Sequence, residues 1–555
     1  NTFATLAIPF QISNIINLGI MKKDIDMVYS TSIKMVIILI VGTATGIIAN
    51  HFVALFATNF TKKNRKLLIR NLESLTVDQV NDFGVASLVT RMGNDNNNAQ
   101  RLIVAFFQMI LPSPIMAVIS IFMTIKLSPT LALIPLFTIL VFALAIVLTL
   151  FKSLPYILKV QKKLDRMTLV LRERFIGAKI IRAFDNSKKE RDKFNNVAQE
   201  YTDNYIIINK KFALLSPMAF ALMSIVITLI IFFGAMKVLN NTLEIGSITA
   251  IVEYSLTTIA ALIMSSMVLV QMPKAVVSIE RIEEVLNVTS EIKDKEELKD
   301  NSYYEDILKQ NPISLTFDNV CFRYKGAEKQ ILKNISFSIK AGERFAIVGA
   351  TGSGKSTIAK VLLRLNDIES GRILINGVDA LDLPLNCLRN QISYTPQKAY
   401  IFSGKIKDNF RFTNKNMTDE EMIKIAKIAQ SYDFIDSLPD KFDSFVAQGG
   451  INFSGGQKQR LSIARALSKD ANIYLFDDSF SALDYATDAK LRKELKTFLK
   501  DKITIIIAQR LNTIADADKI IVLKDSEITG MGTHQELLES NQEYIELAKS
   551  QGILE

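Results

Sequence analysis

A glycine-rich segment at residues 349–356, Gly-Ala-Thr-Gly-Ser-Gly-Lys-Ser, carries the clearest chemistry in this sequence. Apolar residues 344–348 before it are typical of a buried strand, and residues 357–363 after it are typical of a helix. In such a loop, backbone amides and the helix N-terminus surround phosphates, the lysine contacts the β and γ oxygens, and the serine ligates Mg²⁺. The segment predicts a nucleotide site with Mg²⁺. Its expected binding residues are Gly349, Thr351, Gly352, Ser353, Gly354, Lys355, Ser356 and Thr357.

A carboxylate follows a second predicted strand. Residues 473–476 are apolar, and Asp477 comes directly after them. Because this strand ends at the carboxyl edge of the sheet, Asp477 is placed where it can hold the metal through water. Ser356 and Asp477 are therefore predicted metal residues.

A second phosphate-facing motif lies about a hundred residues after the loop. It is the turn Phe453-Ser454-Gly455-Gly456-Gln457, which leads into the basic start of a helix at residues 458–460. One chain thus carries two halves of a phosphate site, and we expect such chains to work in pairs.

The composition of the chain predicts two domains, which together must position these motifs. The chain has 555 residues, which exceeds the size at which single cores stop growing, and 49% of them are hydrophobic. Long apolar runs fill residues 1–285, which we expect to be an all-α transmembrane domain. Residues 286–311 are expected to be a polar linker, and residues 312–555 an α/β phosphate-loop domain with a helical subdomain.

Six stretches are apolar and about 20 residues long or nearly so, as a membrane-spanning helix requires. They cover residues 1–19, 31–59, 102–125, 129–151, 212–236 and 246–272. The first begins at Asn1 within an already apolar stretch, so we interpret the N-terminus as trimmed.

The lysines and arginines set the topology. One cluster of them lies between the second and third stretches and another between the fourth and fifth, so both loops are predicted to be cytoplasmic. These residues are Lys62, Lys63, Arg65, Lys66, Arg70, Lys159, Lys162, Lys163, Arg166, Arg172 and Arg174. The spanning helices should continue into the cytosol and be capped by short helices near residues 76–83 and 175–185, where Phe83 and Phe184 could contact the second domain. The alternative is that these apolar residues belong to ordinary loops.

The net charge of +10 fits cytoplasmic loops better than nucleic-acid binding, so no nucleic-acid partner is expected. Only two cysteines occur, Cys321 and Cys387, which supports neither a disulfide framework nor a metal cluster.

Glu253 is the most conspicuous residue in the apolar stretches, because a carboxylate in a bilayer is costly and normally faces a cavity or a partner. We therefore name Glu253 as a candidate for contact with a cationic substrate or for proton handling. The equally weighted alternative is that it lies near the outer interface or pairs internally. His51 and Gln108 are weaker candidates, and several Phe and Met residues could line an apolar cavity.

The order of these motifs resembles the ATP-binding cassette family over essentially the whole chain. Besides the loop and the turn, the resemblance rests on Tyr324 in Phe-Arg-Tyr, Gln397 in Thr-Pro-Gln, and Ser481-Ala-Leu-Asp484. Six spans before one cassette resemble a type IV exporter half-transporter, and residues 173–184 resemble its second coupling region. The resemblance implies that Tyr324 stacks on adenine and that Gln397 senses Mg²⁺ and the coupling helices. It also implies that a partner's nucleotide contacts Ser454, Gly455, Gly456, Gln457 and Asp484.

Two positions depart from this family. Where it usually has a glutamate that polarises water, this chain has Asp478, whose carboxylate reaches about 1.5 Å less. Where it expects a histidine, this chain has Gln509, which cannot share a proton as imidazole can. Because a displacement of about 1 Å can cost roughly a hundredfold in rate, hydrolysis at this site should be slow.

Both catalytic positions, Asp478 and Gln509, are therefore degenerate, while the turn at 453–457 is intact. This asymmetry resembles the degenerate-site subunit of bacterial heterodimeric multidrug exporters, in which the partner half-transporter provides the hydrolytic residues. A slow homodimer is the alternative. The resemblance implies ATP-driven export of amphipathic, often cationic compounds, with lipid or peptide export, or a regulatory gating subunit, as the other possibilities. The bias toward Lys, Ile and Asn and the absence of a visible targeting segment favour a bacterial plasma (inner) membrane.

Overall fold

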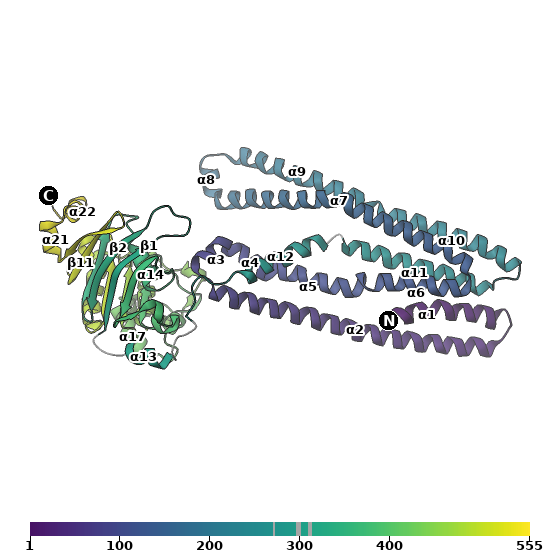
Figure 1. The fold of residues 1–555 in the computed structure, drawn as a ribbon, viewed down its shortest axis with the longest axis horizontal. Helices are drawn as coiled ribbons and strands as arrows, with labels where there is room; N and C mark the ends of the chain where they lie inside the picture. The colour runs from purple at the N-terminus through teal and green to yellow at the C-terminus, as the bar shows by residue number, and fades with distance from the viewer. Residues whose placement is uncertain (270–271, 296–300, 309–312, 555) are drawn as a thin grey trace. The chain divides into compact units, whose positions relative to one another are not determined.

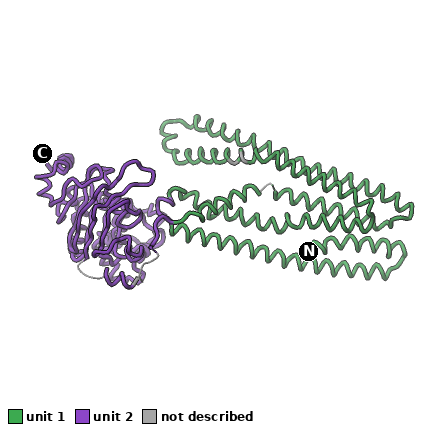
Figure 2. Tube along the Cα trace, viewed as in Figure 1, with its two compact units in different colours: residues 1–74, 81–289 green, residues 75–80, 290–555 purple. Residues whose placement is uncertain are grey.

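The computed structural model describes residues 1–554 except 270–271, 296–300 and 309–312. Two compact units divide the chain (Figure 2). Unit 1 comprises residues 1–74 and 81–289, and unit 2 comprises residues 75–80 and 290–555. The division after Thr289 falls inside the predicted linker at 286–311, of which residues 296–300 and 309–311 lie outside the described residues. The linker also contains a helix that its polar composition did not predict, α13 (Asn301–Leu308).

Unit 1 is helical throughout its described part, and six of its helical stretches are long and apolar enough to cross a membrane, which confirms the prediction (Figure 1). The first two are α1 (Thr2–Asn14) with the π-helical η1 (Ile15–Ile20), and α2 (Ile25–Ser74). The third comprises α4 (Val85–Thr90), η2 (Arg91–Asp95), α5 (Asn96–Ala105), η3 (Phe106–Ile110) and α6 (Pro112–Leu127). The others are α7 (Pro129–Ile176), α9 (Ser187–Ala213) with α10 (Leu215–Leu239), and α11 (Ile245–Leu269), which α12 (Met272–Asn287) follows.

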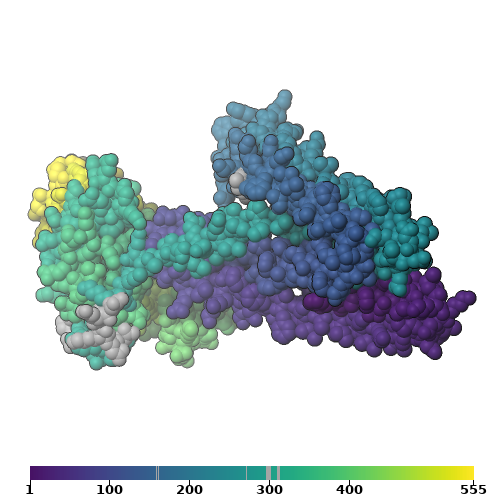
Figure 3. All heavy atoms as spheres, turned by 45° about the vertical axis from the view of Figure 1, so that its right-hand side comes forward, coloured from purple at the N-terminus to yellow at the C-terminus, as the bar shows by residue number. Residues whose placement is uncertain are grey.

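The long helices extend well past the apolar stretches, as expected. α2 has 50 residues, so it is about 75 Å long, whereas the hydrocarbon core of a bilayer is about 30 Å thick. Short helices stand where they were predicted, at α3 (Val77–Phe83) and α8 (Ala178–Ala183). α8 joins α7 to α9, and the tip of this hairpin stands clear of the other helices of its unit (Figures 1 and 3).

The helices of unit 1 pack through small residues and a few buried apolar clusters. A Cβ at Gly246 would lie 2.5 Å from the carbonyl oxygen of Ser13, so the glycine permits the close approach of α11 to α1. Phe142 of α7, Ala219 of α10 and Ile259 of α11 form one of the clusters. Most of the remaining large apolar side chains are exposed, as expected of surfaces that face lipid.

Unit 2 is built on a six-stranded sheet in the order β12-β11-β3-β10-β9-β6, in which every neighbouring pair except β11 and β12 is parallel. Its strands are β3 (Arg344–Gly349), β6 (Ile392–Thr395), β9 (Ile473–Asp477), β10 (Ile503–Ile507), β11 (Lys519–Lys524) and β12 (Glu527–Gly532). The central strands β3, β9, β10 and β11 are mostly apolar because helices and a second sheet cover both faces. The second sheet is antiparallel, in the order β2-β1-β4-β5, and a third pairs β7 with β8. Their bounds are β1 (Ser314–Phe322), β2 (Leu332–Lys340), β4 (Ser370–Ile375), β5 (Val378–Asp379), β7 (Gly404–Lys405) and β8 (Phe445–Val446).

The helices of unit 2 include a group inserted between β6 and β9, which is the helical subdomain expected from the sequence. It contains α16 (Ile406–Phe410), α17 (Asp419–Ile428), α18 (Tyr432–Asp436) and α19 (Gly455–Leu467). The other helices are α14 (Lys355–Leu362), α15 (Leu385–Asn390), α20 (Tyr485–Phe498), α21 (His534–Ser540) and α22 (Gln542–Ser550). Buried residues of the subdomain, such as Phe410 and Leu461, join one apolar cluster with Tyr474 and Phe476 of β9.

Candidate nucleotide site

The phosphate loop connects β3 to α14, as predicted. Gly354 caps α14 with φ 99°, and a Cβ there would lie 2.6 Å from the carbonyl oxygen of Ile331, so only glycine fits. Within the described structure, the buried hydroxyl of Ser353 has no hydrogen-bond partner. Lys355 Nζ donates to the carbonyl oxygens of Gly349 (2.8 Å) and Ala350 (2.7 Å). The glycine-rich loop at the start of α14 and the unpaired hydroxyl of Ser353 fit a phosphate, because each provides hydrogen-bond donors for phosphate oxygens.

Ser356 and Asp477 meet at the carboxyl edge of the sheet. Ser356 Oγ donates to Asp477 Oδ1 at 2.9 Å, and the hydroxyl of Tyr394 donates to Oδ2 at 3.4 Å. Burial raises the pKa of Asp477, although these two hydrogen bonds oppose that shift. Burial also lowers the pKa of Lys355, against the attraction of Asp478 and Asp477. A hydroxyl beside a carboxylate matches the oxygen ligands that Mg²⁺ prefers, so the donor set fits the metal.

The carboxylate of Asp478 is held by two amides. Gln397 Nε2 and Gln509 Nε2 each donate to Asp478 Oδ2 at 3.1 Å. Asp478 has φ 46°, and its backbone N–H donates to the carbonyl oxygen of Ile507 at 2.8 Å, which fixes the direction of its side chain. The structure thus brings together Asp478 and Gln509, the two positions predicted to be degenerate, and Gln397, the predicted metal-sensing glutamine.

Tyr324 lies beside the phosphate-loop helix. Its ring is half-buried, its hydroxyl lies 3.4 Å from Thr357 Oγ1, and it accepts a hydrogen bond from Lys360 Nζ at 3.0 Å. Lys360 Nζ also lies 5.0 Å from the ring centroid. The side chain expected to stack on adenine is therefore held by a lysine of α14.

The signature turn caps α19. Ser454 Oγ accepts from Gln457 N at 3.3 Å, and Gln457 Oε1 accepts from Ser454 N at 2.9 Å, which together form a capping box. Among the described residues, no hydrogen bond joins this turn to Lys355 or Asp477. Ser454 and Gly455 are exposed, and whether they serve the site of a second chain stays a prediction. The carboxylate of Asp484 caps α20 through Thr487 N at 2.9 Å.

Several residues near the site were not found from the sequence. Tyr394 and Lys360 are examples. Only their positions in the sequence could have indicated that they lie near the site. Tyr394 lies three residues before Gln397, and Lys360 lies one turn after Ser356. Residues 75–80 pack with unit 2, where Asn366 Nδ2 donates to Asp78 Oδ2 at 2.7 Å. No sequence pattern paired these two residues, which are 288 positions apart.

The predicted membrane candidates do not form one site. Glu253 is exposed on α11, about 12 Å along the helix from its start at Ile245. His51 lies edge-on to Phe52, and Gln108 donates to Asn50 at 3.0 Å. Whether Glu253 contacts a substrate stays a prediction.

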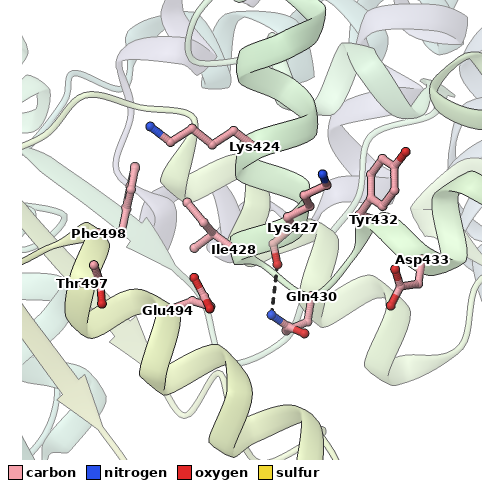
Figure 4. Close-up of a pocket in the computed structure, with 9 residues that line it drawn as sticks. All are labelled: Lys424, Lys427, Ile428, Gln430, Tyr432, Asp433, Glu494, Thr497 and Phe498. Carbon is pink, nitrogen blue, oxygen red and sulfur yellow. Dashed lines mark hydrogen bonds between the residues drawn. The ribbon is translucent and has the colours of Figure 1, made fainter.

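A hollow of about 970 Å³ on unit 2 lies away from this chemistry (Figure 4). Its walls come from α17, α18 and α20, and Gln430 Nε2 donates to the carbonyl oxygen of Lys427 at its edge. Lysines stand beside Asp433 and Glu494, so its charge is mixed. No residue of the phosphate loop or the signature turn lines it, so size alone does not indicate the functional site here.

Comparisons with known proteins agree with this geometry. Residues 1–262 match the model of the ABC transporter transmembrane region, and residues 332–481 match the model of the ABC transporter. The chain is 33% identical over 543 residues to YfiB of Bacillus subtilis (strain 168), an uncharacterized ABC transporter ATP-binding protein, covering 98% of this chain and 93% of that protein. This chain belongs to the ABC transporter family.

Other relatives of this ABC transporter bear export-related names. A putative export ATP-binding/permease protein of Rickettsia bellii is 31% identical and covers 100% of this chain and 95% of its own. An ATP-dependent lipid A-core flippase of Desulfotalea psychrophila is 33% identical over 70% of this chain and 66% of its own. The solved structure of a bacterial Atm1-family ABC exporter with ATP bound is 23% identical, has a TM-score of 0.82, and covers 99% of this chain and 95% of its own. That likeness confirms the type IV exporter fold.

Membership of this family establishes the coarse activity. The chain is an ABC exporter subunit with six spans and one cytosolic cassette, and its ATP-binding domain implies ATPase activity coupled to transport. ABC exporters function as dimers, so a half-transporter requires a second one. The predicted multi-pass membrane location is confirmed at this level.

Proposed function

We propose that this chain is the degenerate-site subunit of a heterodimeric exporter, whose main hydrolytic site lies on the partner's phosphate loop. The observation that carries the proposal is that Gln397 and Gln509 both donate to one carboxylate oxygen of Asp478. The signature turn at 453–457 of the same chain is intact by contrast. The carboxylate of Asp478 accepts hydrogen bonds from two amides, and its side chain is one methylene shorter than the glutamate usual in the family. It is therefore poorly placed to orient the attacking water. The signature turn carries no such defect.

The residues of this chain have distinct roles in the proposal. Lys355, the loop amides and the hydroxyl of Ser353 bind phosphate oxygens, while Tyr324 supports the base. Ser356, Asp477 and Gln397 would hold Mg²⁺, which neutralises charge on the phosphates when bound. Ser454 to Gln457, with Asp484, present the start of α19 to the partner's nucleotide. Nucleotide binding then closes the two cassettes and reorients the membrane cavity from inward to outward facing.

The exposed tip of the α7–α9 hairpin supports a partner chain. Phe175, Ile176, Ile180 and Phe184 are between 65% and 80% exposed around α8. These large apolar side chains lie beyond the apolar span 129–151, where water rather than lipid would surround them, so burial against another protein surface is favourable. We propose that they dock on the partner's cassette.

Amphipathic compounds are the proposed substrates, and the bacterial plasma membrane is the proposed location. One observation favours lipid export as a second candidate: a relative at 33% identity is named a lipid A-core flippase. The two candidates share an amphipathic substrate and differ in its headgroup.

The test is ATPase activity of the purified chain, alone and with the half-transporter from the adjacent reading frame. The expected result is little activity alone and substantial activity of the pair. Lys355→Ala in this chain is the control, because it removes nucleotide binding at the degenerate site only. Substantial ATPase activity of the lone chain that Asp478→Asn abolishes would show a homodimer and overturn the proposal.

A further inference from the structure

A small pocket lies in unit 1 between α5 and α12, which pack side by side (Figure 1). Its volume is about 290 Å³. Two cations, Arg101 and Lys274, line it together with the apolar side chains of Leu102, Met109 and Val268. The pocket therefore combines a positively charged part with an apolar wall, which is the complement of an anionic amphiphile.

The two cations have no counter-charge in the described structure. No carboxylate lines the pocket, and neither Arg101 nor Lys274 forms an ion pair with a described residue. Both side chains are exposed, so their charged groups are available to a ligand. Nearby arginines behave differently: Arg91 pairs with Glu284 at 2.7 Å, and Arg281 lies 3.9 Å from Asp95.

The walls of the pocket are held in place by polar contacts behind it. Asn98 Nδ2, itself in the lining, donates to Ser278 Oγ at 3.0 Å, and Ser278 Oγ donates to Asp95 Oδ1 at 2.9 Å. Asp95 and Ser278 are buried. This chain of hydrogen bonds ties α5 to α12, so the spacing of the two helices that carry the cations is set before a ligand arrives.

The position of both cations along the chain matches the depth of lipid headgroups. Arg101 comes directly before the apolar stretch 102–125, and Lys274 follows the apolar helix α11, which ends at Leu269. Both therefore stand at the cytoplasmic boundary of the bilayer, while Leu102, Met109 and Val268 lie on its apolar side. A headgroup at the cations would place its tail along these side chains.

We propose that this pocket is the entry site for a transported amphiphile with an anionic headgroup, a phosphate or a carboxylate. The proposal rests on the exporter function and specifies its substrate class. It differs from the expectation of often cationic compounds, which the family resemblance implied and for which Glu253 was a candidate contact. Glu253 lies on α11 near the opposite, outer end of the spans, so it does not offset the charge of this pocket.

Lys152 provides a matched control for nonspecific contact with headgroups. It follows the apolar stretch 129–151, stands at the same bilayer boundary, is exposed, and is absent from the lining of the pocket. If the cations at this boundary act only through general attraction to anionic lipid, then Lys152→Gln weakens binding as much as Lys274→Gln does.

The experiment measures equilibrium binding of radiolabelled dodecyl phosphate to the full chain with its co-expressed partner in phosphatidylcholine nanodiscs. Dodecyltrimethylammonium is the probe with the same tail and opposite charge. Arg101→Gln and Lys274→Gln are each expected to weaken dodecyl phosphate binding about tenfold, because each removes a charge-assisted hydrogen bond. Lys152→Gln should leave it unchanged, and the charge-conserving Arg101→Lys and Lys274→Arg should retain most of it.

Three outcomes overturn the proposal: equal binding by the wild type and the Arg101→Gln/Lys274→Gln double variant, equal weakening by Lys152→Gln, or tighter binding of dodecyltrimethylammonium. ATP-driven transport of dodecyl phosphate by the pair, reconstituted in vesicles, is measured separately. Transport without selective dodecyl phosphate binding removes this inference and leaves the exporter function. Absence of dodecyl phosphate transport by a pair that hydrolyses ATP removes the role of the pocket in entry, even where the binding assay shows an anion site.

Discussion

Gln509 Nε2 and Asp478 Oδ2 lie 3.1 Å apart, so the two positions that depart from the usual family pattern bond to each other. The same oxygen accepts a second hydrogen bond from Gln397 at the same distance. The two departures thus form one local arrangement. The shorter carboxylate is positioned by the amide that stands where a histidine is expected.

Lengthening this carboxylate should increase hydrolysis. Asp478→Glu adds about 1.5 Å of reach, and restoring the position of a catalytic group by about 1 Å can change the rate roughly a hundredfold. We expect ATPase activity of the lone chain to rise at least tenfold, with a further rise when Gln509→His is added. An assay of phosphate release measures the ATPase activity of the wild type and both variants. Unchanged activity in both variants would show that the defect lies outside this pair.

The signature turn and Asp478 should affect the heterodimer differently. Ser454→Ala removes the side-chain cap of α19, which costs about 1 kcal/mol, and also removes a hydroxyl that faces the partner's nucleotide. In the co-expressed pair it should reduce ATPase activity about tenfold or more, whereas Asp478→Asn should leave most of it. Thr418→Ala, which removes a similar cap from α17, is the control for stability. The opposite order of effects would assign the main hydrolytic site to this chain.

The hydrogen bond between Asn366 and Asp78 should couple hydrolysis to transport. Asn366→Ala removes this contact, which is worth about 0.5–1.5 kcal/mol. We expect transport per ATP hydrolysed to fall while ATPase activity persists. Asn416→Ala, at an exposed asparagine of the same unit, should change neither. Parallel loss of both activities in the Asn366→Ala variant would instead indicate a folding defect.

Arg364 should matter more for stability than an exposed arginine. It is 4% exposed, donates to Asp367 Oδ1 at 2.9 Å and to the carbonyl oxygen of Lys293 at 3.0 Å, and so anchors the described start of the linker. Arg364→Met removes these hydrogen bonds and a third one, at 3.4 Å, to the carbonyl oxygen of the buried Leu383, and should lower the free energy of unfolding by about 1–3 kcal/mol. Arg372→Gln, which removes an exposed pair with Asp318, should cost about 0–1 kcal/mol. Thermal melting of the purified chain compares them, and equal losses would contradict the anchoring role.

Asp477 should make stability depend on pH. Burial raises its pKa in the folded state above the ordinary value of 3.8, so between those two values the folded chain binds more protons than the unfolded chain. Its contribution to stability is therefore present below pH 3.8 and is lost as pH rises through the folded pKa. The Asp477→Asn variant does not lose stability in this way, because asparagine does not titrate.

The melting temperature of Asp477→Asn, minus that of the wild type, should therefore increase from about pH 4 to about pH 8. Circular dichroism measures both melting temperatures, since this chain has no tryptophan for a fluorescence measurement. Asp501→Asn, at an exposed aspartate, controls for general charge effects. A difference that shrinks with pH would show that the hydrogen bonds from Ser356 and Tyr394 outweigh burial.

The sequence by itself determined the features that depend on local chemistry and periodicity. The phosphate loop needs glycines where φ is positive, as at Gly354, and the strands on both sides of the site need unbroken apolar runs. Six spans followed from apolar length alone. The short helices α3 and α8 followed from the polar segments between spans that were too long for turns.

Only the tertiary structure decided which distant side chains meet. Asp478, Gln397 and Gln509 come from three separate segments, and they converge because parallel strands β6, β9 and β10 end at the same sheet edge. Arg101 and Lys274 are 173 positions apart, as their numbers show, and share a pocket because α5 packs on α12. Sequence periodicity places a residue on a face of its own element, whereas the neighbours of that face depend on how the elements pack.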